Sequence, residues 1–232
     1  MIATLVMEAF NSYVESCHTI KALLPEWCDH RVKVEAELRE LTHQFDEWKV
    51  EAERAGIASM AVLRSDAREG PTPVTGCAFK FVCSDSLRKR IDDTVALLEQ
   101  AKPLTENLIK AIEAFQEKEN LFLEKIDYGS FKDCREFVLP SDTNVYPLLA
   151  VVWRLSRRKF SELDFFPSML GILLNLKESL HLARTVRNIP NLAVEGIQGR
   201  YEVAFQLHNL ASCVKWECHH LPHLIMEYLP IP

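Results

Sequence analysis

Residues that commonly bind metals gather near the carboxyl terminus, in the run from Glu217 to His223 (ECHHLPH) and at Cys213 just before it. Cysteine thiolate and histidine imidazole are frequent zinc ligands. Structural zinc sites usually take paired ligands, spaced CxxC or HxxxH, from two parts of the chain. His219 and His223 are four residues apart, but Pro222 lies between them and is expected to disturb the turn that would align them. We therefore expect surface histidines at a fraying helix end.

The candidate metal ligands of this region are Cys213, Cys218, His219 and His223. The interpretation that we favour is that no metal binds here and that the chain needs no cofactor. A metal-dependent helical enzyme that uses these cysteines and histidines stays open as the alternative.

Thiol chemistry is suggested by two further places, Cys17-His18 and Cys28-Asp29-His30. A cysteine nucleophile needs a base within hydrogen-bond reach. Adjacent residues on a helix point about 100° apart, so such a pair would have to be assembled between helices. Cys17 falls on the apolar face of its helix, which favours a core position. The seven cysteines are odd in number and exclude a complete disulfide framework, which favours reduced thiols in a cytosolic protein.

Other catalytic patterns are missing from the sequence. The close glycine pairs, Gly70 with Gly76 and Gly196 with Gly199, belong to no GxxxxGK or GxGxxG pattern that follows a strand. A di-iron bundle would need Glu-x-x-His pairs on an inward apolar stripe, and we find none. We therefore expect a protein that is not an enzyme.

A cluster of four cations is the most distinctive charge feature of the chain, whose formal net charge is -6. The cluster consists of Arg154, Arg157, Arg158 and Lys159. Helices with cations on one face and Trp, Phe or Leu on the other bind anionic lipid, with about 1 kcal/mol of attraction per cation near the surface. The alternative is structural, because cations near a helix end complement its dipole and pair with acidic helices. These four residues are our candidate contact with a membrane or partner.

The elements that must position these residues are helices. Helical periodicity predicts segments at about 2-24, 31-60, 85-102, 104-126, 146-162, 167-187 and 194-221, with one long loop at about 65-84. The cleanest stripe contains Val34, Leu38, Leu41, Phe45 and Trp48. Proline is expected to end helices at Leu24-Pro25 and to split them at Pro103. The fold class is therefore all-α, a single domain over 1-232 that forms a bundle of six or seven amphipathic helices.

The cluster of cations lies among the residues of an apolar stripe at helical spacing, formed by Leu149, Val152, Trp153, Ser156 and Phe160. Leucines from Leu163 to Leu180 continue this rhythm. Because almost every predicted helix has an equally strong stripe, we assign these leucines to a shared core. The four cations are therefore the feature that distinguishes this segment from the other predicted helices.

The amino terminus lacks the basic region of a signal peptide, and the longest apolar run, 169-176, is far shorter than the ~20 residues that span a bilayer. We expect a cytoplasmic protein that associates with membranes peripherally. A net charge of -6 argues against nucleic acid as a partner.

Three stretches resemble the fungal HeLo domain, the α-helical cell-death module at the amino terminus of HET-S-type incompatibility proteins. They are FNSYVESCHTIKAL at 10-23, EAELRELTHQFDEWKVEAERAGI at 35-57 and WRLSRRKFSELDFFPSMLGILLNLKESL at 153-180. The resemblance implies an all-α bundle whose amino-terminal segment can be released to attack membranes, as one domain of a larger protein. It implies no particular site residue.

The sequence thus favours a non-enzymatic α-helical interaction or signalling domain. Its most specific form is a cell-death module that exposes an amphipathic helix at membranes or docks it on a partner. The partners that we expect are proteins, a second copy of the chain among them, and an anionic membrane surface. A structural oligomerisation bundle is the remaining alternative.

Overall fold

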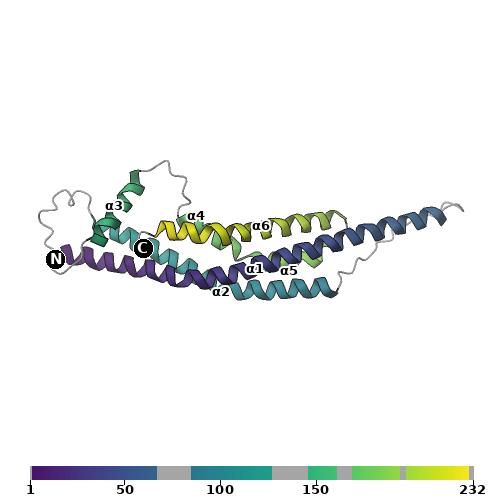
Figure 1. Ribbon diagram of the computed structural model, residues 1–232, viewed down its shortest axis with the longest axis horizontal. Coiled ribbons are helices and arrows are strands. Elements are labelled where there is room, and N and C mark those ends of the chain that lie inside the picture. Colours follow the sequence, from purple (N-terminus) through teal and green to yellow (C-terminus); the bar gives the residue numbers. More distant parts are fainter. Residues whose placement is uncertain (1, 67–84, 127–145, 161–168, 194–196, 230–232) are drawn as a thin grey trace. The chain divides into compact units, whose positions relative to one another are not determined.

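The computed structural model describes residues 2–66, 85–126, 146–160, 169–193 and 197–229 (Figure 1). These ranges contain α1 (Ile2–Asp66), α2 (Asp85–Lys125), α3 (Tyr146–Phe160), α4 (Met169–Ser179), α5 (Leu182–Ala193) and α6 (Ile197–Tyr228). Within them every regular element is an α-helix, and no strand occurs. The predicted all-α class is confirmed for this part of the chain.

Two predicted helix boundaries are wrong, because α1 passes through Pro25 and α2 passes through Pro103. A proline inside a helix removes one backbone hydrogen bond and costs about 3 kcal/mol. Both prolines are exposed, while Leu24, next to Pro25, and Ala101, two residues before Pro103, are buried. Burial of the flanking residues offsets the local cost, so the segments predicted at 2-24 and 31-60 form one helix, as do those at 85-102 and 104-126.

The predicted count of six or seven packed helices is also not borne out. The segment predicted at 167-187 is divided into α4 and α5, which only Leu180 and His181 separate. If α4 and α5 are counted as one interrupted helix, the described residues contain five helices, fewer than the six or seven predicted. The helix predicted at 194-221 is α6, which continues through Pro222 to Tyr228. Of the predicted loop at 65-84, residues 65 and 66 belong to α1 and the others lie outside the described residues.

The chain divides into two compact units, each of which has its own core. The first unit comprises 1–30, 102–180 and 217–232. Aromatic rings lie at its centre: Tyr13 of α1 stacks on Phe122 of α2 at 5.5 Å and contacts Phe115 at 5.3 Å between ring centroids. Phe115 also meets the ring of Tyr228, from α6, edge-on at 6.2 Å. The core of this unit therefore joins α1, α2 and α6, and it extends to buried residues of α3 and α4.

The second unit comprises 31–101 and 181–216. Its part of α1 buries the whole described portion of the stripe that the sequence predicted, with Phe45 and Trp48 in ring contact at 5.2 Å. The same unit contains buried apolar residues of α2, α5 and α6. They include Leu87, Ile91, Leu98, Val186, Ile189, Val203, Leu207 and Val214.

Polar side chains connect the helices at the surface of the second unit. Arg90 of α2 lies 2.9 Å from Glu37 of α1, Arg187 of α5 lies 3.3 Å from Glu99 of α2, and His208 of α6 lies 2.9 Å from Asp46 of α1. Within α1, Arg39 pairs with the buried Glu35, and the hydrogen bond and charge of Glu35 raise the pKa of Arg39. Exposed pairs of this kind contribute about 0 to 1 kcal/mol each, so the apolar stripes supply most of the stability.

Candidate functional site

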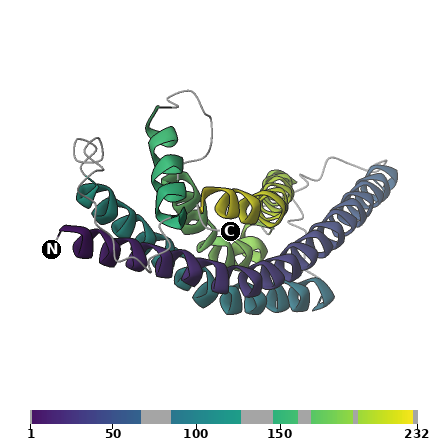
Figure 2. The same ribbon diagram turned by 60° about the vertical axis from the view of Figure 1, so that its left-hand side comes forward.

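The candidate site begins with α3, which the first unit anchors through one face. Leu148, Val151 and Leu155 follow each other at steps of three and four residues and are buried in the core of that unit. In Figure 2 α3 stands at a steep angle to α1 instead of running along it. The stripe of Leu148, Val151 and Leu155 is thus the side of α3 that this core buries.

The outer face of α3 carries large apolar side chains. Leu149 is 47% exposed and Trp153, one turn later, is 60% exposed. The sequence assigned the apolar stripe of Leu149 and Trp153 to the core, and for these two residues that prediction is wrong. The helix α3 has two apolar stripes, and the one that is buried in the core is formed by Leu148, Val151 and Leu155.

The four predicted contact residues, Arg154, Arg157, Arg158 and Lys159, belong to α3, but their side chains lie outside the described residues. The sequence of α3 contains no aspartate or glutamate. The helix that presents Leu149 and Trp153 therefore also carries four positive charges with no acidic residue of its own to offset them.

The leucines that follow in α4 are divided between core and surface. Leu173 and Leu176 are buried, as predicted, and Leu180 packs against the same core. Leu170 and Leu174, which are one turn apart, are both more than half exposed. The shared-core prediction is therefore wrong for Leu170 and Leu174, whereas the part of the pattern at 163–166 lies outside the described residues.

The candidate metal ligands do not form a site of three or more protein ligands. Among the described residues, which include all four candidates, no three His, Cys, Asp or Glu side chains are placed to hold one metal ion. Cys213 belongs to the second unit, while Cys218, His219 and His223 belong to the first. The predicted fraying near Leu221 is wrong, because α6 continues through Pro222 for another turn and a half or so. His219 and His223 are exposed on a regular helix.

The thiol candidates are placed unlike activated nucleophiles. Cys17 is fully buried in the core of the first unit, as its position on the apolar stripe predicted. Cys28 is partly buried, and burial, helped by the charge of Asp29, raises the pKa of its thiol. A raised pKa keeps the thiol protonated, whereas catalytic cysteines have a lowered pKa. In this respect Cys28 differs from an activated cysteine nucleophile.

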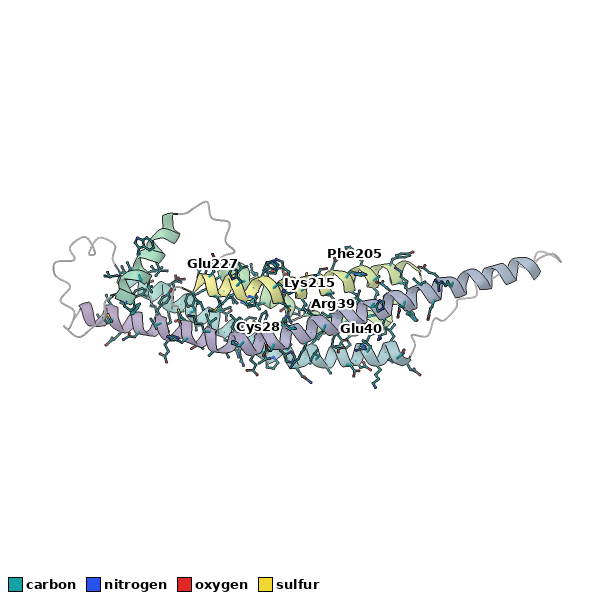
Figure 3. All side chains as sticks on the ribbon, viewed as in Figure 1. Cys28, Arg39, Glu40, Phe205, Lys215 and Glu227 are labelled. Atoms are coloured by element: carbon teal, nitrogen blue, oxygen red, sulfur yellow. The ribbon has the colours of Figure 1, made fainter. Side chains whose placement is uncertain are left out.

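One exposed feature was missed in the sequence, an aromatic pair on α6 in the second unit. Phe205 is 66% exposed, and Figure 3 shows it on the outer side of α6. Tyr201, one turn earlier, is also exposed, and Lys49 lies over its ring at 4.6 Å. Both residues are out of phase with the buried Val203 and Leu207, and that offset was the signal available in the sequence.

The described residues define an all-α helical protein with amphipathic helices and two apolar cores. None of the described helices is both long enough and apolar enough to cross a membrane. No family model, no curated protein and no solved structure matches the chain. The resemblance to the HeLo domain stays a prediction.

Proposed function

We propose that this chain is a non-enzymatic helical interaction domain that docks the outer face of α3 on an anionic membrane surface. The observation that carries the proposal is the exposure of Leu149 and Trp153, one turn apart, on the helix that contains the four cations. The inner face of the same helix is held by the core. Docking in this form would need no unfolding, because the apolar side chains are already at the surface.

The chemistry of α3 fits a lipid headgroup layer. Tryptophan is enriched at membrane interfaces, where its ring contacts acyl chains and its N–H stays near water. Four cations near an anionic surface contribute roughly 1 kcal/mol each, an attraction that salt weakens. The apolar contact is small, and two side chains alone would bind weakly. We therefore expect binding that depends on anionic lipid and is reversible.

A cell-death role is the more specific form of this proposal, and it rests on the resemblance of the three quoted stretches. Membrane docking through α3 does not depend on that resemblance. Membrane docking and the cell-death role can therefore be tested independently, and membrane docking is tested first.

Cosedimentation with vesicles tests the proposal. The full chain is mixed with vesicles of phosphatidylcholine alone or with about a third phosphatidylserine. We expect binding only to the anionic vesicles, and we expect it to fall as salt increases. Replacing Arg154, Arg157, Arg158 and Lys159 by Gln should abolish it, and Trp153→Ser should weaken it.

Phe205→Ser is the matched control, since it removes an exposed aromatic side chain from α6 in the other unit. It should bind like the unchanged chain. Binding that persists in the variant with four Gln residues would contradict the proposal. So would binding that Phe205→Ser weakens as much as Trp153→Ser. If the folded chain binds no vesicle, membrane docking is contradicted, and an acidic protein becomes the partner to test for α3.

A further inference from the structure

His219 and His223 lie on one face of α6, one turn apart. The helix is continuous from Ile197 to Tyr228, so Pro222 does not break the register between them. Both residues are exposed, and the side chain of His223 is 81% exposed. Side chains four residues apart on a helix start from Cβ atoms about 5–6 Å from each other. Two imidazoles at this separation can reach a common point above the helix surface.

We propose that His219 and His223 form a two-ligand site for a divalent transition-metal ion of the kind that imidazole prefers, namely zinc, copper or nickel. The regular helix fixes the spacing of the two rings before the metal arrives. Because no three metal-binding side chains are grouped among the described residues, the protein supplies two ligands here. The remaining coordination positions are filled by water or by a ligand from another molecule.

Glu227 adds a negative charge beside this site. It follows His223 by one turn on α6 (Figure 3), and its Oε2 atom lies 4.0 Å from Nε2 of His223, which is within reach of an ion pair but too long for a hydrogen bond. A carboxylate near a bound cation attracts it, and salt weakens this attraction. Glu227 therefore favours the binding of a divalent ion at the two histidines.

Neighbouring metal-binding residues point elsewhere. Cys218 and His220 adjoin His219 in the sequence, and adjacent residues on a helix are turned about 100° from each other. Cys213 is exposed but belongs to the second unit. The two cysteines provide matched controls, since neither lies three or four residues from His219 or His223.

Calorimetric titration of the full, untagged chain with nickel chloride tests the site, with the thiols kept reduced by a phosphine. We expect saturable binding of one ion at the pair. The variant His219→Gln/His223→Gln should lose this binding, and Glu227→Gln should weaken it about threefold through the lost charge. His18→Gln, at an exposed histidine of α1, and Cys213→Ser/Cys218→Ser should keep it. Nickel should also raise the midpoint of thermal unfolding of the unchanged chain but not that of the variant with two substituted histidines.

Retained binding in His219→Gln/His223→Gln overturns the proposal, as does its loss in Cys213→Ser/Cys218→Ser. Chemical modification of the histidines in the unchanged chain tests the site without any substitution. Nickel should protect His219 and His223 from diethyl pyrocarbonate while the exposed His18 stays reactive, as mapped by mass spectrometry of the peptides. Equal reactivity of all three histidines with and without nickel would overturn the proposal too.

Discussion

Trp27 donates its indole N–H to the hydroxyl oxygen of Thr105 at 3.1 Å, which joins α1 to α2 inside the first unit. Both residues are almost fully buried. Each follows, by two positions, a proline that its helix passes through: Pro25 in α1 and Pro103 in α2. The side-chain hydrogen bond therefore connects the two helices where each has lost a backbone donor. It fixes the pairing of α1 and α2 at their locally weakest turns.

This hydrogen bond should be measurable as a coupling energy. Trp27→Phe keeps most of the ring but removes the donor, and Thr105→Val removes the acceptor at similar volume. We expect each variant to lose about 1–3 kcal/mol of unfolding free energy, since each leaves a buried polar group with one hydrogen bond fewer or leaves a gap. Urea unfolding of the two single variants and the double variant should give a coupling of about 1 kcal/mol. Strict additivity would show that the bond contributes nothing.

The stripe in the second unit predicts a large difference between two positions of α1. Phe45 is fully buried in contact with Trp48, whereas Val50 is exposed. We expect Phe45→Ala to lower the unfolding free energy by about 3–5 kcal/mol through lost burial and a cavity. Val50→Ala should change it by less than about 0.5 kcal/mol. Urea unfolding checks both, and similar losses at the two positions would contradict the assignment of this stripe to the core.

The stripes themselves were readable from the sequence because burial follows the helical period. Val34, Leu38 and Phe45 are buried where the spacing predicted. The sequence did not predict that the helices continue through Pro25, Pro103 and Pro222. Proline locally favours a helix break, whereas packing of the flanking residues against other helices stabilises the continuous helix. A cost of about 3 kcal/mol is smaller than the stabilisation from burying a few large side chains beside it.

The candidate site was predicted only in part for a related reason. The sequence of α3 contains two apolar stripes, and the pattern alone does not say which one meets a neighbour. Leu148 and Val151 face the core, whereas Leu149 and Trp153 are exposed, and this choice depends on which side of α3 meets the rest of its unit. The Cys and His types near the carboxyl terminus were identified, but the continuity of α6 that aligns His219 with His223 came from the structure.

The ion pairs of Arg90 should matter little. Its guanidinium lies 2.9 Å from Glu37 and 3.7 Å from Glu40, and all three side chains keep about a third or more of their exposure. Water and salt screen such groups, so we expect Arg90→Gln to lower the unfolding free energy by at most about 1 kcal/mol. Thermal unfolding at low and high salt measures this, with Lys89→Gln, an exposed neighbour on α2, as the charge-matched control. A large loss that salt does not reduce would contradict this view of the pair.

The reactivity of Cys28 should depend on pH in a defined direction. Burial first, and the charge of Asp29 second, raise the pKa of its thiol. Because the thiolate is the reactive form, alkylation of Cys28 by iodoacetamide should be slow near neutral pH and should accelerate only above the usual range for a thiol. Asp29→Asn removes the smaller cause, so it should lower the pKa and speed the reaction modestly. Mass spectrometry of the Cys28 peptide over a pH series measures both, with the exposed Cys213 as an internal standard.

The raised pKa of Cys28 also determines how the free energy of unfolding changes with pH. A thiol whose pKa is higher in the folded than in the unfolded chain binds its proton more tightly when folded. Its contribution to stability is complete below the unfolded pKa and is lost as the pH rises through the folded pKa. Urea unfolding of the unchanged chain should therefore become easier toward alkaline pH, and Cys28→Ala should remove part of that dependence. An unchanged slope in Cys28→Ala, together with fast alkylation at neutral pH, would show that the thiol is not held in its protonated form by the fold.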